Sequence, residues 1–300
     1  MATFKTYDSV GAKEDVSDVI SILDKHETPF TSTIDGNMRT VKQKIYEWQE
    51  DEQEGGADNA QVEGFEATEE AHTTTEMKQN TTQIFSRTIK LSGSLEATDH
   101  YGRKSELARQ IMKKGKALKL DRERACVGVD QAMVLGSTAV ARRHASVSQM
   151  IAAGNKIAAG AVPLTELILR SAIRKAYTVG SKATRFMVAP NVAEQTAEFD
   201  GNATRSREVT GANAKEIIHV VDVYTTALGT LSVETNREML ATQGLLWRPS
   251  DWKGVVLKGR GWFRETLAKT GDNTKIMLAG EYGLQHDNEE ASVLITGIGA

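Results

Sequence analysis

The chain has 300 residues, of which 40% are hydrophobic and 25 are glycines, an average apolar content that excludes a disordered or collagen-like protein. Its 37 basic and 40 acidic side chains give a net charge of -3, so no overall positive field would draw it to nucleic acid or an anionic membrane. No stretch approaches the roughly 18 apolar residues of a membrane span. The single cysteine, Cys126, is expected to be a buried thiol in a protein that folds in a reducing cytoplasm.

The N-terminal segment predicts a short amphipathic helix that leads into an extended arm. Its apolar residues fall at helical spacing: Val16, Val19, Ile20 and Leu23. Acidic residues precede them, where the helix dipole favours negative charge. Pro29 disfavours helical geometry at Thr28, so the helix should end before that residue and the chain should continue extended past Phe30. The apolar face of this helix needs a partner.

Residues 45–77 form an acidic segment with 11 carboxylates and no lysine or arginine. Partly alternating residues at 40–48 and 73–91 predict two strands, and Gly55 and Gly56 predict a flexible tip between them. We interpret the segment as a long acidic hairpin. The alternative is a solvated loop or disordered linker, but Trp48, Val62 and Phe65 are apolar anchors that a linker seldom carries.

Residues 103–124 carry the opposite charge, with nine basic and three acidic side chains and a local balance of +6. Leu107, Ile111 and Leu118 lie at helical spacing, which predicts a long helix with one buried edge and a broad cationic face. Such a helix could bind nucleic acid or a membrane surface. This one has no aromatic side chains to stack on bases or insert into lipid, so specific DNA binding is not favoured.

The rest of the chain predicts an α/β region and then several strands. Helices are expected from Pro163 onward and over residues 192–199, the second capped by Asn191, with a strand over 185–189 between them. Residues 215–226, 229–236, 275–285 and 291–298 are β-rich.

Motifs of catalysis or metal binding are absent from the sequence. The six histidines are scattered without metal-ligand spacing, and there is no nucleophile elbow or phosphate loop. Gly259 and Gly261 lack the third glycine of a dinucleotide fingerprint, because Arg264 stands there. We expect no enzyme activity, no cofactor and no metal. A Ser-His-Asp triad assembled only in space, and thus a hydrolase, is the enzyme alternative.

Several short motifs, in order along the chain, carry a family resemblance. They are Thr6-Tyr7-Asp8-Ser9-Val10-Gly11, Glu14-Asp15-Val16-Ser17-Asp18-Val19-Ile20, Thr28-Pro29-Phe30, Glu47-Trp48-Gln49, Val62-Glu63-Gly64-Phe65, Gly102-Arg103-Lys104-Ser105-Glu106-Leu107-Ala108, Lys113-Lys114-Gly115-Lys116, Leu267-Ala268-Lys269-Thr270-Gly271-Asp272 and Gly280-Glu281-Tyr282. With these motifs the chain resembles, nearly end to end, the major capsid proteins of tailed double-stranded DNA phages, whose fold is named after the Hong Kong 97 phage.

The resemblance implies an α+β subunit with four parts. These are an N-terminal arm (residues 1–40), an extended hairpin loop (41–90), a peripheral domain with a long spine helix (91–150 and 256–290) and an axial domain (151–255 and 291–300). It implies a structural protein that self-assembles through hexamers and pentamers into the icosahedral shell of a virion, in the host cytoplasm. The implied partners are further copies of the chain, a portal protein and non-specifically packaged double-stranded DNA, with no membrane.

In that fold the hairpin lies across a neighbouring subunit near its spine helix, and here those two elements have opposite charge. Exposed ion pairs are worth only about 0 to 1 kcal/mol each, so charge should steer assembly while apolar anchors hold it. The expected interface residues are Trp48, Glu50, Asp51, Glu52, Glu54, Asp58 and Phe65 in the hairpin, Arg103, Arg109, Lys113 and Lys116 in the spine helix, and Val16, Val19, Ile20 and Leu23 in the arm.

Two departures from relatives shape further expectations. In some relatives a lysine of the hairpin forms a covalent cross-link to a neighbouring subunit. This hairpin has no lysine between Lys44 and Lys78, so the subunits of the shell should be held together by noncovalent contacts. Some carry their own scaffolding region, whereas this chain reaches the arm motif within its first 20 residues, which implies a separate scaffolding protein. The alternatives are the shell of a bacterial nanocompartment, the hydrolase, and an unrelated binding module with an acidic hairpin.

Overall fold

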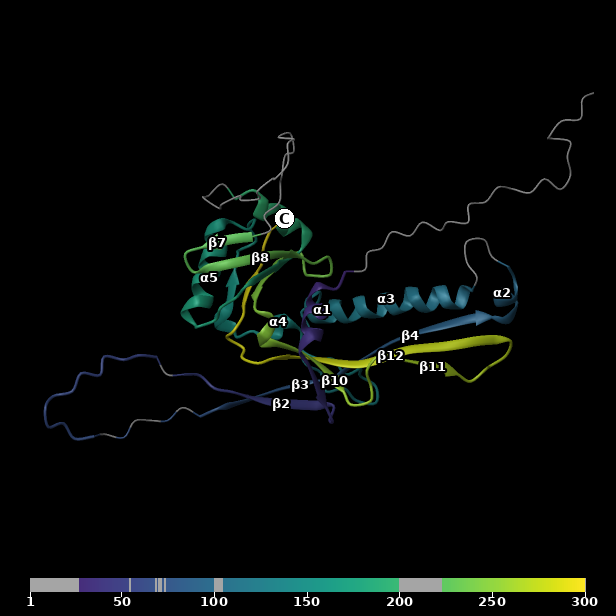
Figure 1. Ribbon diagram of the computed structural model, residues 1–300, viewed down its shortest axis with the longest axis horizontal. Coiled ribbons are helices and arrows are strands. Elements are labelled where there is room, and N and C mark those ends of the chain that lie inside the picture. Colours follow the sequence, from purple (N-terminus) through teal and green to yellow (C-terminus); the bar gives the residue numbers. More distant parts are fainter. Residues whose placement is uncertain are drawn as a thin grey trace, which may run out of the picture.

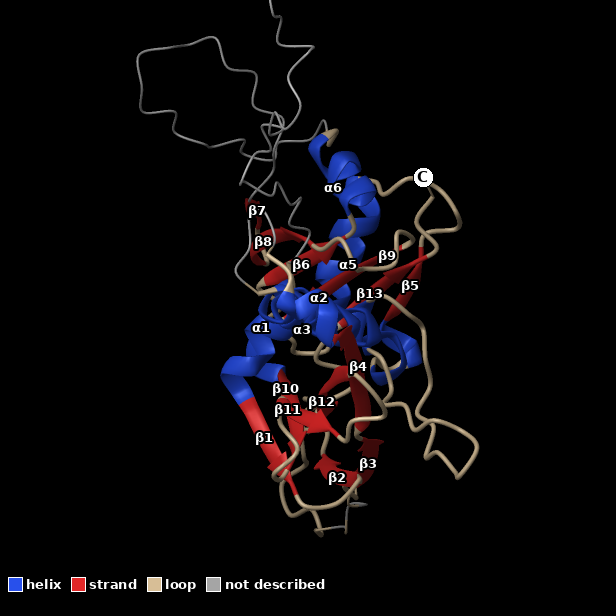
Figure 2. Ribbon diagram, turned by 90° about the vertical axis from the view of Figure 1, so that its right-hand side faces the viewer, coloured by secondary structure: helices blue, strands red, loops and turns tan. Residues whose placement is uncertain are grey.

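Two β-sheets that share a central junction organise the chain in the computed structural model, which describes residues 27–53, 55–67, 69, 72, 74–99, 105–199 and 223–299. One sheet and its long helix form an elongated body, and the other sheet forms a compact body beside it (Figure 1). The turned view separates the two sheets clearly, one above and one below the helices at the junction (Figure 2).

The elongated body is built on a five-stranded sheet. Its strand order is β1 (Met38–Val41), β10 (Trp252–Leu257), β12 (Asn273–His286) and β11 (Phe263–Leu267), with β4 (Gln83–Ser92) also paired to β12. The short α2 (Gly93–Ala97) follows β4. The strands β4 and β12 pair along ten residues, from Gln83 against Tyr282 to Ser92 against Asn273. This long ribbon supports α3 (Glu106–Val127), a helix of about 33 Å.

The buried edge of α3 is the one expected from its sequence. Leu118 and Ala125 are buried with Phe85 and Ile276 of the ribbon, and Leu107 and Ile111 pack against the same cluster. Alternate residues of β4 face the helix, which agrees with the period of two in a strand. The hydroxyl of Ser105 caps the helix by accepting a hydrogen bond from the amide of Ala108.

The compact body contains a six-stranded mixed sheet. Its order is β5 (Lys156–Ala158), β13 (Val293–Thr296), β9 (Gln243–Trp247), β6 (Arg185–Val188), β8 (Gly229–Thr235) and β7 (Val223–Thr226). Two helices, α5 (Glu166–Thr178) and α6 (Pro190–Ala197), belong to this body, and apolar residues of both are buried with those of the sheet. The expected strands and helices of the α/β region are thus present in the described residues.

A third hydrophobic cluster joins the two bodies. It includes Trp247 from one sheet, Trp252 from the other and Cys126 from the end of α3, all buried. The short α1 (Pro29–Ile34) inserts Phe30 between the two tryptophans, with ring centroids 4.9 Å and 5.7 Å away, and α4 (Val147–Met150) also contributes. The expectation of a buried cysteine is confirmed, and burial raises the pKa of the Cys126 thiol to about 12.

The hairpin consists of β2 (Ile45–Glu50) and β3 (Glu76–Thr81), which pair from Ile45 against Thr81 to Glu50 against Glu76. Beyond these strands the chain runs away from the rest of the molecule (Figure 1). The predicted strand over 73–91 is therefore two strands, because the chain changes sheets at Thr82.

Three local expectations are wrong. Pro29 begins a helix, because proline at the first helical position loses no intrahelical hydrogen bond. The helix expected at Pro163 begins at Glu166, where the Thr165 hydroxyl provides the cap. The cap of α6 is not Asn191, which lies inside the helix and donates its side-chain amide to the carbonyl of Ala241.

Candidate functional site

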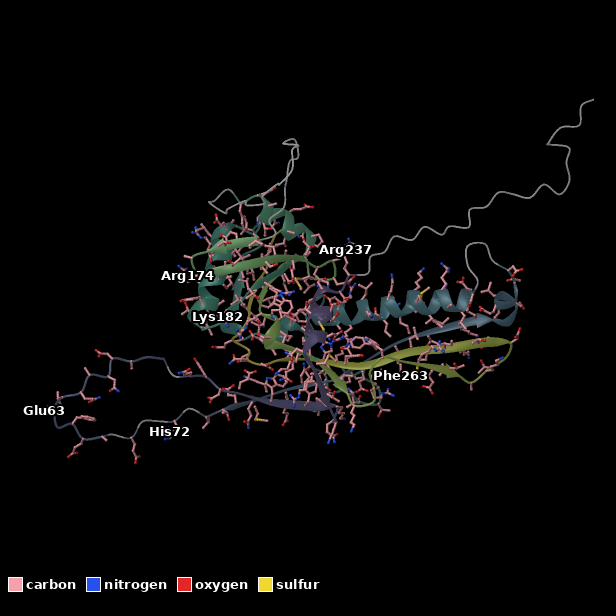
Figure 3. All side chains as sticks on the ribbon, viewed as in Figure 1. Glu63, His72, Arg174, Lys182, Arg237 and Phe263 are labelled. Atoms are coloured by element: carbon pink, nitrogen blue, oxygen red, sulfur yellow. The ribbon has the colours of Figure 1, made fainter. Side chains whose placement is uncertain are left out.

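The described residues of the outer hairpin form no hydrogen bond or ion pair with the body of their own subunit. Asp51, Glu52 and Asp58 are exposed, and none forms an ion pair with another described residue. Side chains on both legs point into solvent, and Glu63 lies at the far end (Figure 3). The hairpin turn is thus near Glu63 instead of at Gly55 and Gly56, where it was expected.

The turn at the far end is closed by a backbone hydrogen bond. The amide of Phe65 donates to the carbonyl of Val62 at 3.1 Å, and Gly64 adopts a φ of 83°, a conformation that glycine tolerates best. Val62 and Phe65 are 77% and 55% exposed. The closed turn therefore presents two apolar side chains next to the carboxylates of Glu63 and Glu66.

The inner part of the hairpin, by contrast, is attached to the subunit. Trp48 stacks on Tyr46 with ring centroids 6.1 Å apart and packs against the cluster that contains Val41 and Val255. Glu50 accepts hydrogen bonds from the Trp48 indole and from the amide of Glu289, and burial raises the pKa of its carboxyl. These two predicted interface residues thus have partners in their own chain.

A second set of bonds fixes the point where β3 continues into β4. The buried carboxylate of Glu281 accepts a hydrogen bond from the Thr82 hydroxyl at 2.7 Å and pairs with Arg142 and, at 3.5 Å, with Arg260. Asn80, also buried, donates to the carbonyl of Leu284 and accepts from the amides of Thr81 and Ala145. These contacts determine the direction in which the hairpin leaves the body.

The exposed face of α3 is cationic but narrower than its composition indicates. Lys113, Lys116 and Lys119 are exposed. Arg109, in contrast, is partly buried and pairs with Glu106 one turn earlier at 3.1 Å.

Arg122 does not belong to the cationic face. It is 3% exposed, its guanidinium contacts Asp35 at 2.7 Å, and it lies 4.5 Å above the ring of Tyr282. The carboxylate of Asp121 turns back to the ribbon and accepts two hydrogen bonds of 2.6 Å from Arg87.

Glu123 is a buried residue of α3 whose carboxylate has hydrogen-bond partners in several parts of the chain. Its carboxylate accepts hydrogen bonds from the amides of Phe30 and Thr31, from the Thr31 hydroxyl and from the Asn236 amide. It therefore ties the first turn of α1 to the spine helix and to the compact body. Burial has the largest effect on this carboxyl and raises its pKa. The hydrogen bonds lower the pKa but do not offset the effect of burial.

Several predicted interface residues lie outside the described residues. They are Val16, Val19, Ile20 and Leu23 of the arm, Glu54 of the hairpin, and Arg103 before the spine helix. None of the predicted hairpin acids that the structure describes lies close to Lys113 or Lys116 of the same chain, because the hairpin and α3 extend in opposite directions (Figure 1).

Analysis of the sequence missed Asn80, Glu123, Arg142 and Glu281. Each is a polar residue with partners far away in the chain, so no local pattern marks it. Among the described residues, no group of histidine, cysteine and carboxylate side chains could hold a metal ion, and no helix has the length and apolar content to cross a bilayer.

Comparison with known proteins identifies the family. The SU10 major capsid protein family matches residues 2–299. The major capsid protein of Escherichia phage Phieco32 is 29% identical over 346 aligned residues, which cover 99% of this chain and 97% of that protein.

Solved structures share the fold at low identity. The capsid of cyanophage A-1(L) superposes with a TM-score of 0.67 and 11% identity over 99% of each chain. The SrpI encapsulin of Synechococcus elongatus has a TM-score of 0.58, with 11% identity over 95% of this chain and 93% of that one. The encapsulin likeness is one of fold alone, whereas the family match and the phage relative extend along the whole sequence. The chain therefore belongs to the SU10 major capsid protein family and is a shell-forming phage capsid protein with the Hong Kong 97-type fold.

Proposed function

We propose that the acidic hairpin of each subunit lies along α3 of a neighbouring subunit, and that this contact sets the register in which copies close into hexamers and pentamers. The observation that carries the proposal is that two exposed surfaces of opposite charge lie apart in one subunit. Asp51, Glu52 and Asp58 are exposed and lack ion-pair partners among the described residues, while Lys113 and Lys116 are exposed on a helix that points the other way.

The size of the charge effect limits its role. An exposed ion pair contributes about 0 to 1 kcal/mol and is screened within roughly 8 Å at physiological salt. The charges therefore guide and align subunits, and the apolar surface buried around them supplies most of the holding energy, at about 25 cal/mol per Å². Weak repeated contacts suit a closed shell, because misplaced subunits leave while complete rings persist.

The same proposal includes the remaining partners and the four parts of the subunit. A shell of this family would assemble in the host cytoplasm around a separate scaffolding protein, incorporate a portal and then hold double-stranded DNA without sequence preference or catalysis. Two separate sheets support distinct peripheral and axial parts, and because β4 and β10 both pair with β12, residues 83–90 and 252–255 go with the peripheral part. The arm residues Val16, Val19, Ile20 and Leu23 would contact a neighbour through their apolar face.

Charge reversal on the helix tests the hairpin contact. The Lys113→Glu/Lys116→Glu variant should remain folded, since both side chains are exposed, but should lose shell assembly as judged by electron microscopy and sedimentation. Lys113→Arg/Lys116→Arg is the matched control, because it keeps the charge and should assemble normally.

A compensating change completes the test. Adding Asp51→Lys and Glu52→Lys to the charge-reversed helix should restore shells, since attraction is recovered with opposite signs. Normal assembly of the Lys113→Glu/Lys116→Glu variant would contradict the steering role of the helix.

A further inference from the structure

A polar pocket lies beside the C-terminal half of α3. It is lined by Lys119 and Arg122 of the helix, by Thr28, Ser32 and Asp35 in and around α1, and by Trp262 of the β10–β11 connection. The hydroxyls of Thr28 and Ser32 are 3.0 Å apart, and Ser32 and Lys119 are exposed. The pocket continues the cationic face that Lys113 and Lys116 begin.

The charges of the pocket do not balance. Asp35 neutralises one of the two cations by contacting Arg122, which leaves one positive charge. Lys119 forms no ion pair with another described residue, and the Nε of Arg122, although buried, has no hydrogen-bond acceptor in the described part of the chain. A ligand that supplies one negative oxygen group would pair with Lys119 and balance the charge of the pocket.

The hairpin turn has the matching chemistry. The closed turn of Val62 to Phe65 places Glu63 and Glu66 beside exposed apolar side chains. The chain from Glu50 to Glu63 spans up to about 45 Å when extended, which exceeds the length of α3, about 33 Å. Trp262, 36% exposed at the pocket, offers an aromatic surface to an incoming phenyl ring.

We propose that this pocket binds a carboxylate, Glu63 or Glu66, from the hairpin turn of a second copy of the chain, with Phe65 resting on Trp262. The inference rests on the hairpin contact proposed above and adds its end point. One carboxylate brings the pocket to neutrality, and the hydrogen bond from Phe65 to Val62 already closes the turn, which lowers the conformational entropy lost on binding.

Paired cysteines test the end point directly. Oxidised shells of the Ser32→Cys/Glu66→Cys variant should give a ladder of covalent multimers on a gel, which a reductant removes. The matched control is Ser32→Cys/Asp51→Cys, whose hairpin cysteine lies near the root and should not cross-link. Cys126 is buried and does not compete. Shells with no ladder, or with equal ladders in both variants, would overturn the assignment.

A charge exchange gives a second test that does not require cysteine. Lys119→Glu should weaken subunit association by more than about tenfold, and adding Glu63→Lys and Glu66→Lys should recover most of it. If neutralising the arm residues Glu14, Asp15 and Asp18 reproduces the Lys119→Glu loss while the hairpin exchange does not rescue it, the pocket binds the arm and the inference is wrong.

The two proposals fail in different ways. Suppose that Lys113→Glu/Lys116→Glu loses assembly while Lys119→Glu assembles normally. This result would support the contact between the hairpin and the helix and would contradict only the binding of the turn in the pocket. Normal assembly in both variants would remove the hairpin contact itself.

Discussion

The two ends of one hairpin differ in almost every physical respect. At the root, Tyr46, Asn80 and Glu50 are bonded to strands and loops of their own subunit. At the tip, Val62, Glu63 and Phe65 are exposed, and their hydrogen bonding to described residues is confined to their own turn. A root held this firmly aims the hairpin, and a tip with unsatisfied charge and apolar surface is left for another molecule. Substitutions at the root should therefore affect folding, and those at the tip should affect association.

The largest loss of stability is expected from Glu281→Ala. This change leaves Arg142 without its carboxylate and Thr82 without its acceptor at a buried site, and breaking a buried ion pair typically costs about 3–5 kcal/mol. Urea denaturation measures the effect. Glu265→Ala, at an exposed position of β11, is the control and should change the unfolding free energy by less than about 0.5 kcal/mol.

Lowering the pH should reduce the free energy of unfolding, because two histidines are buried near the root of the hairpin and the junction of the two bodies. Desolvation lowers the pKa of both His144 and His286 to about 4, while the unfolded chain titrates near 6.5. Between these values the unfolded state binds more protons, so stability is lost as the pH falls from 6.5 to 4, by up to about 3 kcal/mol for each histidine.

A variant isolates this effect from other titrations. The raised pKa of Glu123 acts with opposite sign, because that carboxyl gains a proton first in the folded state. The test is to measure the free energy of unfolding over pH 4–7 for the unmodified chain and for His286→Gln. The difference between the two proteins should become smaller as the pH falls. Parallel curves would contradict the assignment of His286 as a neutral buried group.

A smaller effect is expected from Tyr46→Phe. The phenol donates a 2.7 Å hydrogen bond to the carbonyl of Leu284 at a buried site, and its removal should cost about 1–2 kcal/mol without changing the packing of the ring. Thermal denaturation would detect the loss, and assembly should be preserved. Loss of shells from a folded Tyr46→Phe subunit would show that the root, and not only the tip, takes part in association.

The smallest effect on stability, and the largest on association, is expected at the tip. Val62→Ser/Phe65→Ser should change the unfolding free energy by less than about 0.5 kcal/mol, since both side chains are already in water. Shell yield at a fixed subunit concentration should fall at least about tenfold, because the apolar part of the contact is removed. His72→Ser, exposed on the returning leg of the hairpin, is the matched control and should assemble normally.

Most elements of the fold could be predicted from the sequence. The apolar period of α3 and the patterning of residues 185–189, 229–236, 275–285 and 291–298 are local signals, and the helix and strands that they predict are confirmed. The strands β9, β10 and β11 were not predicted. Boundaries were harder, because Pro29 can stop one helix or begin another, and the choice depends on the carboxylate of Glu123 that meets the first turn of α1. The domain divisions and the interface residues stay predictions.

The amino-acid sequence by itself determined that an acidic segment and a cationic helix exist and that the family is that of a phage shell. Only the tertiary structure decided which charges are available. In a count of charged residues, Arg122, Asp121 and Glu123 are no different from the exposed lysines. In the structure, all three side chains are bonded to residues distant in the chain. The physical reason is that burying a charge without polar partners is costly. The buried side chains of Arg122 and Glu123 therefore have partners within the subunit, whereas exposed charges stay accessible to water or to another subunit.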